Sequence, residues 1–473
     1  MDVIDKTDLG EMSATELTRA YAAKEASPVE AVQASLDRIA KFDGAVNAFV
    51  YVVAEEALAE ARASEARWAK GAPLSPIDGV PATIKELTRV KGIPFRKGSV
   101  LGEKEPSPTD LEIVTKLRQA GTPILGTTAS PEFGWKGLTH GPEGGNTLNP
   151  WNTARASGGS SGGAAVAAAL NMGVLHEGSD GAGSIRIPSS FCGVFGIKPT
   201  FGWVPSTAPT GLFELAHRGP LTRTVEDSGL FLNAVAGPSV NALYGRSPKE
   251  VTDFAAASRR SIKGMRIAYA RTLDGAPVAP AVAEAVDRAA KALADLGAIV
   301  EEADPGFASP QQALLDLWYA AQAWAVEQVN PTPEQIAKMD PGFVSITEQG
   351  RLLSARDFIA ADQIRAQLKV TMAKFHERYD ALMLPTMPLT AFEAGVDVPT
   401  GSGMTEWTDW SPFTYPFNMT EQPAVSVNCG FDADGLPIGL QFVGRWFEDE
   451  VVLALAAAYQ AAHPTPFVDA PRS

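Results

Sequence analysis

Two glycine-rich segments that contain serine are the parts of this sequence best suited to chemistry. Residues 158–163 read Gly-Gly-Ser-Ser-Gly-Gly, and residues 178–186 read Gly-Ser-Asp-Gly-Ala-Gly-Ser-Ile-Arg. Glycine lets backbone N–H groups approach a ligand closely, so a serine in such a segment can lie beside a cluster of hydrogen-bond donors. Ser160 and Ser184 are therefore candidates for acyl-transfer chemistry.

The first segment also fits other patterns. Residues 158–162 match the Gly-x-Ser-x-Gly turn that presents the nucleophile of α/β-hydrolases. Such an enzyme needs a histidine further along the chain, and four of the five histidines do follow, so a His-dependent serine esterase stays open on the pattern alone. A phosphate-binding loop is disfavoured, because no Gly-Lys-Ser/Thr follows the glycines.

The motifs around these segments resemble those of the amidase signature family. The resemblance covers nearly the whole chain in the expected order, in residues 78–85, 131–133, 149–152, 158–163, 178–188, 191–193, 196–200, 219–223, 422–426 and 435–441. It implies the fold of that family, an α/β domain whose mixed, twisted β-sheet is covered by helices on both faces. It also makes a homodimer plausible.

The resemblance assigns three catalytic roles by position. Lys85 is the terminal base, Ser160 the intermediate serine and Ser184 the nucleophile, and the Gly159–Ser160 peptide bond is expected to be cis. These roles make physical sense, because a serine hydroxyl needs a base and a lysine serves as one only when it is neutral. We therefore expect Lys85 to be buried, with its pKa lowered from about 10.4 to about 7 or 8.

Several neighbouring residues are expected to support these three. Ser161 is predicted to hydrogen-bond Lys85 or to orient Ser160. Asp180 and Arg186 flank the nucleophile, and we expect them to pair and hold the loop. The histidines take structural roles in this interpretation.

Small residues before the nucleophile indicate an oxyanion hole. We expect its donors to be the backbone N–H groups of Gly181, Ala182, Gly183 and Ser184, since preorganised donors of this kind stabilise a developing oxyanion. Ala182 stands where the family usually has a second glycine, so a negative φ or a reshaped acyl pocket is expected there. Glu86 replaces the aspartate that commonly follows the lysine.

The resemblance implies an enzyme that hydrolyses the carbon–nitrogen bond of a small-molecule amide, anilide or carbamate through an acyl-enzyme, with no metal and no organic cofactor. The Gly-Ala-Gly-Ser-Ile-Arg-Ile-Pro variant is most similar to bacterial amidases that act on aryl amides, nylon-type oligoamides or carbamates (urethanes). Two other classes stay open. One is the glutamine-hydrolysing, amidase-like component of a tRNA-dependent amidotransferase, and the other is a catalytically inactive binding module.

Composition narrows the classes of partner. A net charge of −15 repels nucleic acid. The sequence contains no run of 18 apolar residues, so it does not predict a membrane-spanning helix. The start of the chain, residues 1–5, lacks the basic and apolar features of a signal peptide, so a cytoplasmic location is expected. Cys192 and Cys429 are the only cysteines, without metal-ligand spacing.

The elements that position the site are expected to form a single domain over residues 1–473. Residues 1–65 are predicted to be helical, because Ser13 and Ser27 each open a capping box. The signature core spans 70–235, and the variable 305–415 region is rich in helix signals and in large aromatics that could form core or a substrate cleft. Strands are expected within 77–87, 121–126, 265–269, 298–300, 424–427 and 439–443, and helices at 164–170, 280–296 and 449–461.

Overall fold

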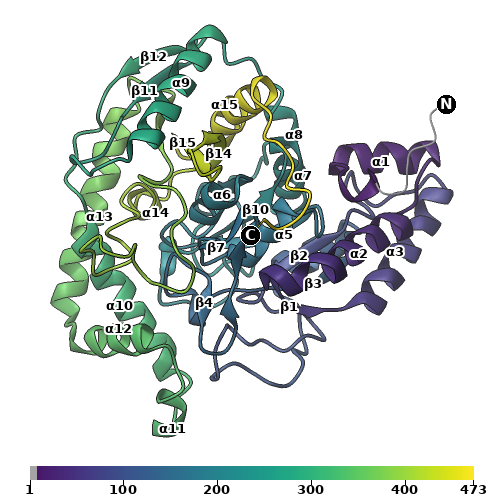
Figure 1. Ribbon diagram of the computed structural model, residues 1–473, viewed down its shortest axis with the longest axis horizontal. Helices are drawn as coiled ribbons and strands as arrows, with labels where there is room; N and C mark the ends of the chain where they lie inside the picture. Colours follow the sequence, from purple (N-terminus) through teal and green to yellow (C-terminus); the bar gives the residue numbers. More distant parts are fainter. Residues whose placement is uncertain (1–7, 473) are drawn as a thin grey trace.

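A mixed β-sheet of eleven strands runs through the middle of the molecule (Figure 1). The computed structural model describes residues 8–472, so the expectation for residues 1–5 lies outside the described residues. The strands of the large sheet follow the order β1-β3-β2-β8-β10-β9-β14-β15-β13-β11-β12. Two short two-stranded pairs, β4 with β5 and β6 with β7, lie outside it. The predicted α/β class is confirmed.

The strands and helices have the following bounds. The strands are β1 (Phe49–Val52), β2 (Ala82–Lys85), β3 (Ile124–Thr128), β4 (His140–Gly141), β5 (Gly145–Asn146), β6 (Leu148–Asn149), β7 (Asn152–Ala156), β8 (Leu175–Asp180), β9 (Phe195–Lys198), β10 (His217–Thr222), β11 (Arg266–Tyr269), β12 (Ile299–Glu302), β13 (Ala381–Pro385), β14 (Ala424–Phe431) and β15 (Pro437–Gly444). The α-helices are α1 (Ala14–Ala23), α2 (Pro28–Val46), α3 (Ala54–Ala69), α4 (Glu112–Gln119), α5 (Gly162–Ala169), α6 (Arg186–Cys192), α7 (Val225–Val235), α8 (Phe254–Ala257), α9 (Pro280–Asp295), α10 (Gln311–Glu327), α11 (Pro333–Ile336), α12 (Pro341–Leu352), α13 (Ala355–Phe375), α14 (Pro416–Met419) and α15 (Asp449–Ala462).

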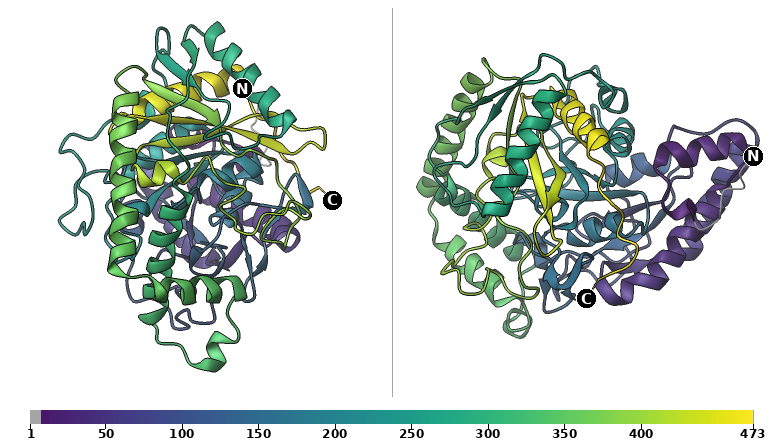
Figure 2. Two further views of the ribbon diagram at one scale, coloured as in Figure 1. Left: turned by 90° about the vertical axis from the view of Figure 1, so that its left-hand side faces the viewer. Right: turned by 45° about the horizontal axis from the view of Figure 1, so that its top comes forward.

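Helices cover both faces of the sheet. Val425 and Val427 of β14 pack into one apolar cluster with residues of α7, α9 and α15. Ser426, which points to the opposite face because side chains alternate along a strand, lies on the side of α6. Helices α10, α12 and α13 form a further layer at one side of the molecule, far from α1–α3 (Figures 1 and 2). The site segments thus lie between a rigid sheet and this helical layer.

The N-terminal region differs from its predicted all-helical form. Both capping boxes are present, at Ser13 and Ser27, and α1 and α2 follow them as predicted. Residues Phe49–Val52, however, form β1, an edge strand that pairs antiparallel with β3. The sequence Phe-Val-Tyr-Val explains the difference, because aromatic and β-branched residues favour a strand that can add to an open sheet edge.

The other predicted elements are present. The unit predicted from residues 265–300 is β11-α9-β12, in which the two strands pair in parallel. The strands predicted within 77–87, 121–126, 424–427 and 439–443 correspond to β2, β3, β14 and β15. The helix-rich character predicted for 305–415 corresponds to α10–α13, although β13 interrupts it.

Candidate active site

Lys85 lies at the end of β2, in the interior of the sheet, and its side chain is fully buried. Its ammonium Nζ donates to Ser160 Oγ at 2.8 Å, to Ser161 Oγ at 2.9 Å and to Ser179 Oγ at 3.1 Å. Ser179 lies on β8, which pairs in parallel with β2. Three hydroxyl groups from two distant segments therefore meet on one lysine. Sequence reasoning gave Ser179 no role, although it stands next to Asp180 in the second glycine-rich segment.

The surroundings of Lys85 favour its neutral form. Burial lowers the pKa of Lys85 to about 7, against the opposing effect of the Glu177 carboxylate. That carboxylate is itself engaged, because it accepts from the Lys85 backbone N–H at 3.0 Å and forms an ion pair with Arg218 at 2.7 Å. The lowered pKa of Lys85 therefore agrees with what a lysine base requires.

The two residues before Ser160, Gly158 and Gly159, occupy positions that require glycine. A Cβ on Gly159 would lie 2.3 Å from the carbonyl carbon of Leu138, and Gly158 has a φ of 73°. The Gly159–Ser160 peptide bond is cis, as predicted. Ser161 then directly precedes α5 and fixes the geometry further, since its Oγ donates to the Ser179 carbonyl at 3.1 Å.

Ser184 lies two residues before α6 and is 6% exposed. Its backbone carbonyl accepts from the Ser161 N–H at 3.1 Å, so the two glycine-rich segments are joined directly beside Lys85. The structure thus brings Lys85, Ser160, Ser161 and Ser184 into one place, as the sequence predicted.

Three of the four predicted oxyanion donors differ from the fourth in their hydrogen bonding. Within residues 8–472, the backbone N–H groups of Gly181, Ala182 and Ser184 have no hydrogen-bond partner. The Gly183 N–H instead donates to Asp180 Oδ1 at 2.6 Å, so it is removed from the predicted set. Gly183 has a φ of 128°, whereas Ala182 does not have a positive φ, which explains why alanine is accepted there.

Asp180 and Arg186 form the predicted pair, and both are fully buried. The guanidinium Nε donates to Asp180 Oδ2 at 2.9 Å, and its other nitrogens donate to the Thr414 carbonyl, Gln441 Oε1 and Asn418 Oδ1. Burial raises the pKa of Asp180, but the Arg186 charge and hydrogen bonds outweigh it and hold that pKa far below its usual value. The pair fixes the loop that carries Ser184.

Histidine does not take part in this arrangement. All five histidines lie within the described residues, and none has a hydrogen bond to Ser160 or Ser184. His217 is buried, its Nδ1 lies 2.9 Å from the Leu215 carbonyl oxygen, and burial lowers its pKa well below the usual value. The geometry therefore does not favour the His-dependent esterase.

A cleft of about 540 Å³ opens beside the buried lysine, and Ser179 is part of its wall. Among the aromatic residues predicted for core or cleft, Trp324 lines this cleft and is 40% exposed. The others are buried in the core, namely Trp318, Tyr319, Trp407, Trp410 and Phe413. Trp318 nevertheless packs against the second glycine-rich segment, because a Cβ on Gly181 would lie 2.8 Å from the Trp318 ring. The variable region thus supplies both core and cleft.

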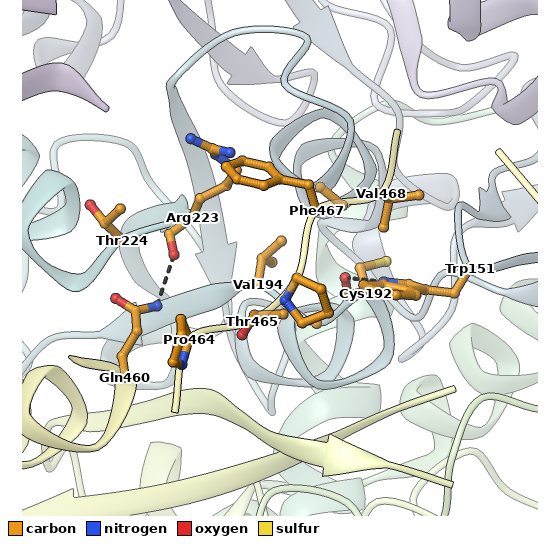
Figure 3. A pocket seen from close by; sticks show the side chains of 13 residues that line it. Trp151, Cys192, Val194, Arg223, Thr224, Gln460, Pro464, Thr465, Phe467 and Val468 are labelled. Carbon is orange, nitrogen blue, oxygen red and sulfur yellow. Dashed lines mark hydrogen bonds between the residues drawn. The ribbon is translucent and has the colours of Figure 1, made fainter. Parts of the chain in front are cut away.

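A smaller cavity of about 240 Å³ lies under the C-terminal segment, away from these residues (Figure 3). The Gln460 side chain donates to the Arg223 carbonyl, the Arg223 guanidinium lies over the Phe467 ring, and Trp151 donates to the Cys192 carbonyl. None of the predicted catalytic residues lines this cavity, and neither do Ser179 and Glu177, which also form hydrogen bonds with Lys85. It is therefore separate from the candidate active site.

Residues 8–472 hold neither a metal-ligand cluster nor a membrane-crossing helix. No group of three or more His, Cys, Asp or Glu side chains in this part of the chain is arranged to hold a metal ion. No helix there combines the length and apolar character that a membrane crossing requires.

Comparison with known proteins agrees with the geometry. The model of the family described as Amidase matches residues 30–453. An acylamidase from Rhodococcus erythropolis is 36% identical over 96% of both chains, and a glutamyl-tRNA(Gln) amidotransferase component from Thermosynechococcus vestitus is 33% identical over 95% of this chain and 97% of its own. The crystal structure of a bacterial aryl acylamidase of the amidase signature family superposes with a TM-score of 0.89 at 28% identity, over 96% of both chains. The chain belongs to the amidase signature family of amide-hydrolysing enzymes.

Proposed function

We propose that this enzyme cleaves its amide through an acyl-enzyme on Ser184, with Ser160 as the proton relay and Lys85 as the terminal base. The observation that carries this proposal is the buried Lys85 ammonium, which lies 2.8 Å from Ser160 Oγ and has a pKa of about 7. A lysine of this kind is neutral in a useful fraction at neutral pH and accepts a proton.

In the proposed reaction, Ser184 Oγ attacks the amide carbonyl carbon while its proton passes to Ser160 and the Ser160 proton passes to Lys85. The oxyanion of the tetrahedral intermediate accepts hydrogen bonds from the free N–H groups of Gly181, Ala182 and Ser184. The proton then returns through Ser160 to the leaving nitrogen as the C–N bond breaks. Water then attacks the acyl carbon while one of its protons passes through Ser160 to Lys85. That proton returns through Ser160 to Ser184 Oγ as the ester C–O bond breaks and the acid is released.

We infer that the substrate is a small-molecule amide, anilide or carbamate. The cleft beside Lys85 has an apolar wall with the aromatic residues Phe95, Phe133 and Trp324. The acylamidase relative and the aryl acylamidase neighbour support the same class. A cytoplasmic location, a homodimer and a single domain over residues 1–473 remain predictions from the sequence.

The glutamine-hydrolysing component of an amidotransferase is the second candidate, because the amidotransferase relative is nearly as similar as the acylamidase. The two candidate functions predict different substrates for the purified protein alone. We expect the purified protein alone to hydrolyse 4-nitroacetanilide and to leave glutamine intact. Glutamine hydrolysis without anilide hydrolysis would favour the second candidate.

Labelling with a fluorophosphonate tests the roles of the residues. We expect Ser184→Ala to abolish labelling and Lys85→Ala to lower kcat/KM by about 10²- to 10⁴-fold, the usual range for loss of a general base. His217→Ala is the control for the histidine alternative, because His217 lines the cleft but has no hydrogen bond to either serine. This variant is expected to keep most of the activity. An inactive His217→Ala variant beside an active Lys85→Ala variant would contradict the proposed mechanism.

A further inference from the structure

The cleft beside the active site is lined by cations and by no acidic residue, in a protein whose net charge is −15. Its three cations are Arg89, Lys97 and Arg218. Arg89 is neutralised by a two-pronged ion pair with Glu103, and Arg218 by an ion pair with Glu177. Lys97 is different, because its ammonium has no hydrogen bond and no ion pair within the described residues.

The Lys97 ammonium is held in place by aromatic rings. It lies 4.9 Å from the ring centre of Phe95 and 4.9 Å from that of Phe133, and both rings line the cleft. Contact with ring faces stabilises a cation without neutralising it, so its charge stays available to a ligand. Burial lowers the pKa of Lys97, and the charge of Glu103, which is already paired with Arg89, opposes this only in part. An anion beside Lys97 would restore its charged form.

The backbone at Lys97 and at Phe133 has an unusual conformation. Lys97 has a φ of 57° and Phe133 a φ of 49°, a region that residues other than glycine rarely adopt. The two are joined directly, because the Phe133 N–H donates to the Lys97 carbonyl at 2.8 Å. Such conformations persist where the surrounding structure enforces them, and they gather at ligand sites.

Glu86 connects the two loops that contain these residues. Its buried carboxylate accepts from the Gly98 N–H at 2.9 Å and from the Ser130 N–H at 2.8 Å, so it ties the two loops that carry Lys97 and Phe133. Glu86 directly follows Lys85 in the chain. Gly134, which follows Phe133, lies close to the catalytic groups, because a Cβ on Gly134 would lie 3.2 Å from Ser160 Oγ. The cleft wall at Phe133 is therefore next to the proposed proton relay.

We propose that Lys97 is a specificity residue that binds a carboxylate group on the substrate, while the apolar body of the substrate packs against Phe133, Leu212 and Trp324. The preferred substrates are then apolar or aryl amides that carry a negative charge away from the scissile bond. This inference rests on the proposed function of the site, since it names the class of amide that the cleft selects. The attraction of a cationic cleft for an anion also weakens as salt is added.

The test compares acidic substrates with neutral ones of the same shape. One pair is 4-acetamidobenzoate with 4-nitroacetanilide, which places the charge in the amine half. The other is 4-anilino-4-oxobutanoate with 4-methylpentananilide, which places it in the acyl half. We expect Lys97→Met to lower kcat/KM about tenfold or more for the acidic member of at least one pair, as for loss of a hydrogen bond to a charged group, and less than about twofold for the neutral members.

Two variants serve as controls. Lys97→Arg is expected to keep the preference for the acidic substrate, and Lys104→Met, which removes the same charge from an exposed position outside the cleft, is expected to leave every rate unchanged. If Lys97→Met affects the acidic and neutral members of both pairs equally, the proposal is wrong.

A binding measurement separates this proposal from the proposed function. Calorimetric titration of Ser184→Ala with the same two acids, with and without Lys97→Met, does not depend on turnover. Weaker binding in the double variant supports the carboxylate site even if the wild type cleaves none of the four substrates, a result that would contradict only the proposed function. Equal binding of both acids to the two variants overturns the carboxylate site.

Discussion

Lys85 is kept out of water, and its pKa of about 7 sets the pH range in which it accepts a proton. Because the charged ammonium cannot serve as a base, we expect kcat/KM to rise with pH through about 7 and to level off above it. A profile of kcat/KM from about pH 5 to 9 with a neutral anilide checks this. A rate that is already constant below pH 6 would show that Lys85 is not the titrating base.

The lowered pKa of Lys85 also makes the free energy of unfolding depend on pH. An unfolded lysine has a pKa of about 10.4, so between about pH 7 and 10 the unfolded state binds the proton that the folded state has lost. The contribution of Lys85 to stability therefore rises with pH in this window and is least favourable below about 7. Buried Lys198, whose pKa burial also lowers to about 7, adds to this trend.

At the scale of single residues, the motifs predicted which groups lie together, and the catalytic roles of these groups stay predictions. Lys85, Ser160 and Ser184 were identified by position, and the structure brings them together. Ser179 and Lys97 were not identified, because nothing local distinguishes them. Ser179 acquires its contact from the pairing of β8 with β2, and Lys97 acquires its role from a loop that lies against Phe133.

Among the elements, the loop between β8 and α6 depends on one buried ion pair. Arg186 donates hydrogen bonds to four different residues from three parts of the chain. Arg186→Met leaves Asp180 as an unpaired buried charge, so we expect a loss of about 3 to 5 kcal/mol in the free energy of unfolding. Urea unfolding of the variant and the wild type measures this difference.

Arg260→Met is a suitable control for that measurement. Arg260 is 55% exposed and lies 3.6 Å from Glu450, and exposed pairs contribute about 0 to 1 kcal/mol. A similar loss in both variants would mean that Arg186 does not hold the loop through the buried pair.

Two of the strands that the sequence analysis missed, β8 and β10, share a physical cause. Strands β8, β9 and β10 form the centre of the sheet beside the site, yet Leu175–Asp180 contains His, Glu, Ser and Asp, and His217–Thr222 contains Pro220. Neither stretch has a continuous apolar or alternating pattern. Their strand form comes from pairing with neighbours, which local sequence does not record. β1 was missed because its four residues follow directly on a long helix.

In the whole molecule, β14 and β15 join two parts of the sheet. They lie between β9, which belongs to the part that contains Lys85 and Ser179, and β13, which leads to β11 and β12. Because the hydrogen bonding is continuous across this junction, we expect residues 8–472 to unfold as one cooperative unit. Tryptophan fluorescence, far-UV circular dichroism and activity should then be lost at one urea concentration, whereas two separate midpoints would indicate two domains.

The position of β14 and β15 in the chain has a consequence for synthesis. These strands lie in the middle of the sheet, but they leave the ribosome after its nine other strands. Until residue 444 emerges, β9 and β13 have no partner between them, and their unpaired edges are open to association with other chains. The nascent protein therefore cannot close its sheet, or complete the support behind Ser184, before residue 444 has been synthesised.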